Sequence, residues 1–210
     1  MAKMTRVQLE QFLARQPGTP NLPKVDLSGL DLSNIDLRGA VLKYADLTRT
    51  ILRDADLEGA VLTHAEMLEA RLNFANLAYA QLNYAKMQNV NLEGAYLGEA
   101  NLEYAQMQDS IFEVANLEAA NLQHAKMWGV TLEFAKLVEA NLQSAYLVSA
   151  NMNGADLRQA DLRYTNLTSA KMRDADLSKA NLTGAKVTPE QLAAAASLEG
   201  ATLPDGKVFQ

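Results

Sequence analysis

The sequence predicts an all-β solenoid, an elongated stack of similar coils, and three regularities support this prediction. Ala and Leu return every five residues without an insertion from Val25 to Val187, which gives 33 consecutive pentapeptides. The central residue of each pentapeptide, at positions ending in 2 or 7, is Leu in 25 of the 33 units. The residue two places before the centre is Ala in 25 units. Because one unit buries too little apolar surface to fold alone, the units must stack.

The remaining central residues predict a filled core. They are Phe112, Val187 and six methionines, four of which recur every 20 residues, at Met67, Met87, Met107 and Met127. A large central side chain and a small Ala together suit a narrow interior, and Met fills irregular gaps in such a core. We therefore expect the methionines to pack inside the solenoid and not to bind a metal.

The motif Ala-(Asp/Asn)-Leu-x-x resembles that of the pentapeptide repeat family. It occurs as Ala-Asp-Leu at residues 45–47, 55–57, 155–157 and 175–177, and the repeats extend over residues 25–187 of 210. The resemblance implies a right-handed quadrilateral parallel β-helix in which four units make one coil, so that residues 25–187 form about eight coils. The tail Ser-Leu-Glu-Gly-Ala-Thr-Leu-Pro-Asp-Gly-Lys, from residue 197, resembles the C-terminal caps of cyanobacterial members with Leu centres.

Short helical caps are predicted at both ends, because open edges of a β-solenoid invite aggregation. Residues 1–24 form an N-terminal cap and linker: Thr5 and Gln8 have capping-box spacing, and we expect a helix through about Arg15 that is ended by Pro17, Gly18 and Pro20. Residues 188–210 form the C-terminal cap. There Thr188, Pro189 and Gln191 suit a helix start, and the Ala run 193–196 is expected to continue the helix over the last coil.

Composition argues against several classes of function. The formal net charge is −6, and residues 61–150 carry ten acidic side chains against four basic ones. Direct nucleic-acid binding needs a basic stripe and is therefore not expected. No apolar run suits a membrane span, no targeting segment is evident and Cys is absent, so we expect a cytoplasmic protein that does not contact a membrane.

No pattern in the sequence indicates catalysis. His64 and His124 lie three coils apart, about 14 Å, which is too far for both to bind one metal ion. Familiar catalytic and nucleotide-binding motifs are missing, and a filled solenoid has no pocket for a substrate. We expect a protein that is not an enzyme and that needs no cofactor or metal.

Residues 20 apart should stack into columns on the surface, and three groups of them are candidates for a partner-binding surface. One column holds aromatic rings, which stabilise a ladder, dock a partner, or do both. A second column holds glutamates and is bracketed by Arg53 and Arg173. These glutamates either keep the rod soluble or attract a basic partner. The third group is apolar and contains the only Trp. The candidates are Tyr44, His64, Tyr84, Tyr104, His124, followed by Ser144 and Tyr164; Glu93, Glu113, Glu133; and Trp128, Tyr146, Val148, Val138.

The leading functional hypothesis is a non-enzymatic protein-interaction module, a rigid rod that docks a regulatory partner of unknown identity. The family resemblance implies an alternative, because some pentapeptide repeat proteins mimic duplex DNA and bind DNA gyrase or related topoisomerases. Mostly Leu centres, a modest charge and the lack of projecting loops distinguish this chain from those members. A structural or stress-related protein without a single partner is the third hypothesis. Both a monomer and a homodimer are compatible with the sequence.

Overall fold

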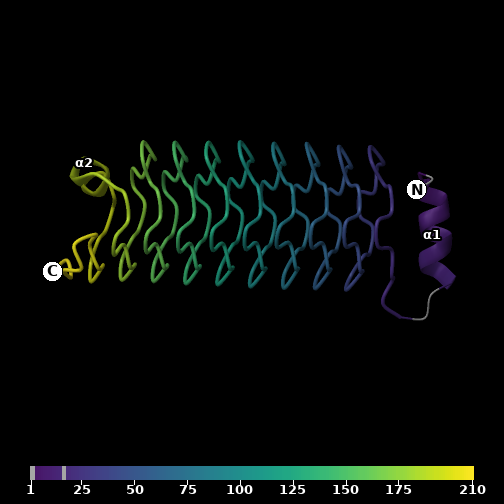
Figure 1. Cartoon of the computed structure of the whole chain (residues 1–210), viewed down its shortest axis with the longest axis horizontal. Helices are drawn as coiled ribbons and strands as arrows, with labels where there is room; N and C mark the ends of the chain where they lie inside the picture. The colour runs from purple at the N-terminus through teal and green to yellow at the C-terminus, as the bar shows by residue number, and fades with distance from the viewer. Residues whose placement is uncertain (1–2, 16–17) are drawn as a thin grey trace.

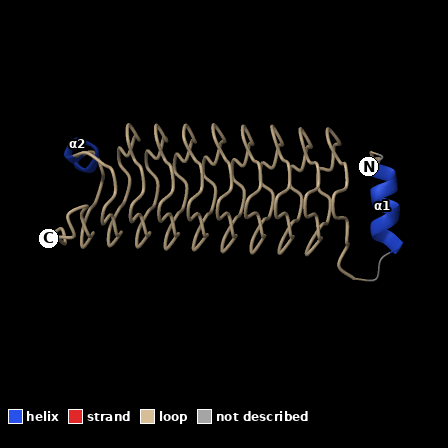
Figure 2. Cartoon of the chain, viewed as in Figure 1, coloured by secondary structure: helices blue, strands red, loops and turns tan. Residues whose placement is uncertain are grey.

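The computed structural model describes residues 3–15 and 18–210, and these form a rod of stacked coils (Figure 1). Helix α1 (Arg6–Arg15) lies at the N-terminal end of the rod and helix α2 (Pro189–Ala193) at the C-terminal end. Between the two helices the chain winds as turns and short extended links, which Figure 2 draws as loop. The coils are joined by isolated parallel bridges and not by long strands.

The bridges define the register of the coils. Asp26 pairs with Asp46, and Asp46 pairs with Glu66, so bridged partners are 20 residues apart and four pentapeptides make one coil. We name the five positions of a unit by their role: bridge (numbers ending in 1 or 6), centre (2 or 7), first turn (3 or 8), second turn (4 or 9) and small (5 or 0). Parallel pairing extends beyond residues 25–187: Lys3 pairs with Asp26 at the N-terminal end, and at the C-terminal end Ser197 and Thr202 pair with Asp176 and Asn181 at a spacing of 21.

The turn after each centre explains the Asp or Asn of the motif. In the turn that begins at Leu162, the side chain of Asp161 accepts a hydrogen bond from the backbone N–H of Arg163 at 3.0 Å, and Thr165 N–H donates to the Leu162 carbonyl at 3.2 Å. Asp and Asn commonly bond to the backbone two residues on, and either amino acid serves at this position. At the second turn position every residue from Lys24 to Gly184 has a positive φ.

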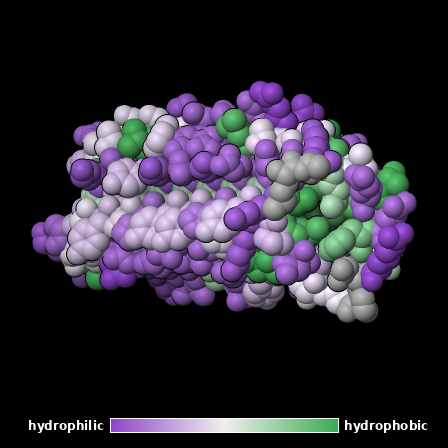
Figure 3. Space-filling view, turned by 45° about the vertical axis from the view of Figure 1, so that its right-hand side comes forward, coloured by the Kyte–Doolittle hydropathy of each residue, from purple (hydrophilic) through white to green (hydrophobic). Residues whose placement is uncertain are grey.

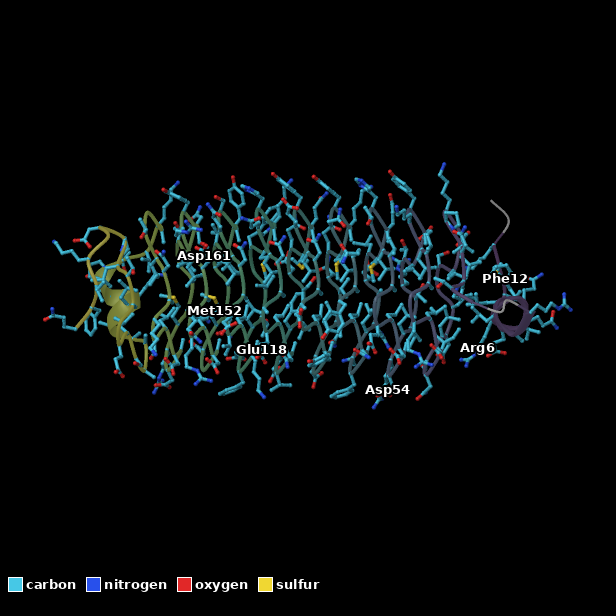
Figure 4. All side chains as sticks on the ribbon, turned by 90° about the horizontal axis from the view of Figure 1, so that it is seen from below. Arg6, Phe12, Asp54, Glu118, Met152 and Asp161 are labelled. Atoms are coloured by element: carbon cyan, nitrogen blue, oxygen red, sulfur yellow. The ribbon has the colours of Figure 1, made fainter. Side chains whose placement is uncertain are left out.

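The core is formed by the centres and the small residues, as predicted. Nearly all of them are completely buried, including Phe112 and the methionine column at 67, 87, 107 and 127. Met152, another central residue, is labelled inside the rod in Figure 4. Where Thr50, Ser110 and Thr165 replace Ala, the buried hydroxyl donates to the carbonyl of Leu27, Met87 or Leu142 respectively. The polar groups are therefore satisfied in an otherwise apolar interior.

Helix α1 begins with the predicted capping box, since Thr5 and Gln8 exchange backbone and side-chain hydrogen bonds. Its Leu9 is completely buried against the first coil. The expected role of Pro17 in ending this segment lies outside the described residues. Helix α2 has its own capping box between Thr188 and Gln191.

The prediction that the Ala run 193–196 continues helix α2 is wrong. The helix ends at Ala193, because the next residues rejoin the coil ladder: Asp174 N–H donates to the Ala194 carbonyl, and Ala196 N–H donates to the Ala175 carbonyl. These backbone hydrogen bonds between neighbouring coils replace the helical hydrogen bonds that Ala residues would otherwise favour. Beyond them, Thr202 pairs antiparallel with Val208 after the turn at Pro204–Gly206.

Candidate partner-binding surface

Five aromatic side chains stack along one corner of the rod and form what we call the ring ladder. Successive ring centroids are 4.8–5.1 Å apart and the planes differ by 2–15°. Every member occupies the second turn position, so its side chain extends from a backbone with positive φ. Ser144 interrupts the column before Tyr164. The ladder consists of Tyr44, His64, Tyr84, Tyr104 and His124.

The Trp128 group lies on the neighbouring corner. Trp128 and Tyr146 are 44% and 50% exposed, and Lys126 bridges to Tyr146. Val148 follows Trp128 one coil later in the same column, where Gly129 N–H donates to the Val148 carbonyl at 2.9 Å. These three residues are therefore neighbours on adjacent coils.

Val138 does not belong to this group, which corrects the sequence-based assignment. It lies half a coil from Trp128, beside a different bridge column, where it lines a shallow groove with Arg158, Gln159 and Lys179. Ten residues correspond to two sides of a four-sided coil, so a short separation in sequence places the two side chains on opposite sides of the rod.

The glutamates at 93, 113 and 133, which we call the acidic column, occupy first turn positions of three successive coils. Asn73 Nδ2 donates to Glu93 Oε2 at 3.4 Å. Within residues 3–15 and 18–210, no Lys or Arg nitrogen lies within 4.0 Å of these three carboxylates. Arg53 and Arg173, at the two ends of the column, pair instead with Asp54 and Asp174 at 3.3 and 3.5 Å.

An exposed apolar edge beside the acidic column was not found from the sequence. Its second-turn members Phe74, Val114 and Phe134 are 49%, 50% and 61% exposed, and Ile111 is exposed on the bridge side of Glu113. Asp54, labelled at the outside of the rod in Figure 4, belongs to the same second-turn column. Reading that column at 20-residue steps, as for the ring ladder, would have revealed the edge.

Several carboxylates on the rod pair with an arginine two residues on, as Asp36 does with Arg38 and Asp161 with Arg163. No group of three or more His, Asp or Glu among the described residues is placed to hold a metal ion. The shifted carboxyl pKa values are lowered and not raised. Hydrogen bonds from Arg38 hold the pKa of Asp36 below its ordinary value, and for Asp161 burial, which raises the pKa, is outweighed by the bonds from Arg163. Such carboxylates stay ionised and stabilise the turns by accepting these hydrogen bonds.

Most of the face drawn in Figure 3 is hydrophilic, and green apolar surface gathers mainly toward the end that carries α1. Neither helix of the described chain has the length and apolar character needed to cross a membrane. The candidate surfaces are columns of side chains on the outside of the rod.

These features define a class of protein, a β-solenoid repeat protein that displays side chains in columns. The chain belongs to the pentapeptide repeat family, whose model "Pentapeptide repeats" matches in eight copies within residues 21–59, 40–73, 55–94, 75–113, 115–154 and 150–188. Proteins of this family form right-handed quadrilateral β-helices and are generally structural or interaction modules. No curated protein sequence matches the chain.

Several solved structures are similar to this chain. HetL, a pentapeptide repeat protein involved in heterocyst differentiation regulation from the cyanobacterium Nostoc sp. strain PCC 7120, is 32% identical, with 98% of this chain and 100% of HetL covered and a TM-score of 0.38. QnrB1, a plasmid-mediated fluoroquinolone resistance protein, is 16% identical over 90% of this chain and 88% of QnrB1, with a TM-score of 0.50. Rfr23 from the cyanobacterium Cyanothece 51142 is 23% identical over 58% of this chain and 93% of Rfr23, with a TM-score of 0.43.

Proposed function

We propose that this protein is a non-enzymatic interaction module, a rigid rod that docks a regulatory protein partner through side chains displayed on its corners. The observation that carries the proposal is the combination of the ring ladder with the exposed Trp128 on the next corner. Aromatic residues, Trp and Tyr above all, supply much of the binding energy where proteins meet. Held on a paired backbone, these rings lose little freedom when a partner binds.

The rod itself is suited to this role because its core and its displayed surface use different positions of each unit. Centres and small residues point inward, while bridge and turn residues supply most of the exposed side chains. We also infer that residues 25–187 form about eight coils. Helices α1 and α2 protect the two ends of this stack, which would otherwise expose unpaired backbone groups.

The experiment is capture of partners from a lysate of the native organism by immobilised protein. The test variant combines Tyr84→Asn, Tyr104→Asn and Trp128→Ser. Asn tolerates the positive φ of positions 84 and 104, so the fold should persist. The control variant is Tyr79→Asn, which removes an exposed Tyr with φ 60 from another corner.

Loss of one captured protein with the test variant, and its retention with the control, supports the proposed function. Equal capture by all three proteins contradicts the assignment of this surface. DNA gyrase is an informative second readout, because inhibition of its supercoiling activity by this protein would favour DNA mimicry instead. The absence of any stoichiometric partner would favour a structural role.

A further inference from the structure

We infer that the exposed apolar edge formed by Phe74, Ile111, Val114 and Phe134 docks a basic amphipathic helix of a protein partner. Apolar side chains of that helix would cover the edge, and its Lys or Arg side chains would face the acidic column of Glu93, Glu113 and Glu133. The inference rests on the proposed interaction function and adds a second surface with a defined kind of partner.

The backbone places the apolar and acidic residues side by side. Glu113 and Val114 are consecutive turn residues, as are Glu133 and Phe134 one coil further on. The Val114 N–H donates to the Glu133 carbonyl at 2.9 Å, so the two turns are joined directly. Ile111 bridges in parallel to Thr131 on the other side of the glutamates. The charged residues are thus flanked by apolar side chains on a rigid support.

The identity of residue 114 is the strongest support for a contact between this edge and a partner. Its φ is 51°, and it is the sole β-branched residue among the second turn positions from 24 to 184, all of which the structure describes. A β-branched residue is poorly suited to this conformation, whereas Gly, Asn and Asp are well suited and occur at equivalent positions. Half of the Val114 side chain is nevertheless exposed. Neither backbone preference nor core packing accounts for Val at this site.

Charge complementarity identifies the partner as basic. The acidic column has no basic partner within the part of the chain that is described, and its three carboxylates recur at coil spacing. A Lys or Arg placed between them would relieve their mutual repulsion. Asn73 and Asn153 follow on either side, and then Arg53 and Arg173. These two arginines would repel a long basic segment, so the basic run that fits spans about three coils, or roughly 10 Å between the outer glutamates.

Phe74, an aromatic member of the edge, already contacts a cation within this chain. The guanidinium carbon of Arg53 lies 5.9 Å from the centroid of the Phe74 ring, within the range of a cation–π contact. No such cation is found over Phe134 among the described residues, although Phe134 is the most exposed member of the edge. An Arg of the partner placed near Phe134 would therefore find both a ring and the Glu133 carboxylate.

The coil spacing favours a helix over an extended segment. Successive coils are about 4.8 Å apart, and side chains one turn apart on an α-helix recur every 4.5–6 Å. A helix that lies along the rod can thus present one side chain to each coil. In an extended strand, side chains on one face recur at about 6.6 Å and lose register with the coils within a few residues.

The inference is tested with a designed probe, a fluorescently labelled helical peptide of Ala, Leu and Lys that carries Leu along one edge and three Lys along the adjacent edge. Its scrambled isomer has the same composition without the two edges. Fluorescence anisotropy measures the affinity of each peptide for the full chain. We expect the designed peptide to bind about tenfold or more tightly than the isomer, because only it matches both strips.

Three variants of the full chain, one of them a control, locate the binding site. The first variant removes three charges from the acidic column (Glu93→Gln, Glu113→Gln and Glu133→Gln). The control removes three charges from the neighbouring corner (Glu99→Gln, Glu118→Gln and Glu139→Gln). We expect about tenfold weaker binding for the first and less than about twofold for the control. A third variant, Val114→Asn with Phe134→Asn, removes apolar contact while keeping residues suited to positive φ, and we expect it to fold and to bind about tenfold more weakly.

Equal weakening by the two glutamine variants would show binding to overall negative charge and would overturn the inference. Equal binding of the designed and scrambled peptides, or undiminished binding to the Val114 and Phe134 variant, would overturn it too. None of these readouts uses the ring ladder or Trp128. A failure here is therefore distinguishable from a failure of the proposed function, which depends on the Tyr84, Tyr104 and Trp128 variant.

Discussion

The ring of Phe134 lies directly over Gly154 of the next coil, so closely that a Cβ atom at Gly154 would be 2.6 Å from Cδ1 of the ring. Phe74 and Gly94 have the same relationship at 2.5 Å. Glycine at these positions thus serves two purposes. It accepts the positive φ of the second turn position, and it leaves room for an aromatic side chain of the preceding coil to lie on the backbone.

Gly154→Ala is predicted to destabilise the protein more than Gly59→Ala does. Both residues have a positive φ, 66° and 63°, but nothing lies within 4 Å of a Cβ at Gly59. The shared backbone cost is about 1–2 kcal/mol, and displacing the Phe134 ring should add about 1–3 kcal/mol at Gly154. Chemical denaturation of the two variants beside the wild type measures the difference. Equal stabilities would mean that the ring moves aside freely.

Tyr84→Asn is predicted to lower stability, since Tyr84 stacks on both His64 and Tyr104. Each contact contributes about 0.5–1.5 kcal/mol beyond its buried area, and the better fit of Asn to positive φ offsets part of the loss. Tyr79→Asn is the matched control, because Tyr79 has φ 60 and no stacked ring among the described residues. Thermal melts should show a lower Tm for the first variant alone. A rise in Tm for both would mean that the ladder does not stabilise the coils.

Asp36→Asn is predicted to reduce the acid sensitivity of the fold. Side-chain and backbone hydrogen bonds from Arg38 hold the pKa of Asp36 below its unfolded value of about 3.9. The stabilisation is therefore present above that value and lost as pH falls through the lower, folded pKa. Asn preserves the backbone bond, as Asn76 does with Ala78 in the same column. Comparison of Tm at pH 7 and pH 3 checks this: the drop should be smaller for the variant than for wild type.

Gln191→Ala is predicted to loosen the C-terminal segment more than Thr188→Ala. Gln191 Nε2 donates to the Leu167 and Ala170 carbonyls at 2.8 and 2.7 Å, while its Oε1 accepts from Thr188 N–H. Its loss should cost about 1–3 kcal/mol through three hydrogen bonds, against about 0.5–2 kcal/mol for the Thr188 cap alone. Hydrogen exchange of residues 188–210 reports the opening directly. Identical exchange in both variants would assign the effect to the capping box only.

The period of five predicted the core and the columns because every repeat imposes the same inward positions. Phe112, the methionine column and the ring ladder therefore lie where the sequence indicated. The Ala run at 193–196 was misassigned because pairing with the last coil outweighs helix propensity, a long-range effect that local sequence does not report. Val138 lies away from Trp128 because ten residues correspond to two of the four sides of a coil, a spatial relationship that nearness in sequence conceals. The roles proposed for the surface columns remain predictions.

The 20-residue register makes this rod sensitive to the length of an insertion. One extra residue after Gly94 would carry every downstream side chain to a new position in the unit, place bridge residues at centres, and separate Glu113 and Glu133 from Glu93. Removal of 20 consecutive residues would instead bring matching positions together and shorten the rod by a single layer, about 4.8 Å. The protein can thus be lengthened or shortened in whole coils, with the pattern on each corner kept in phase.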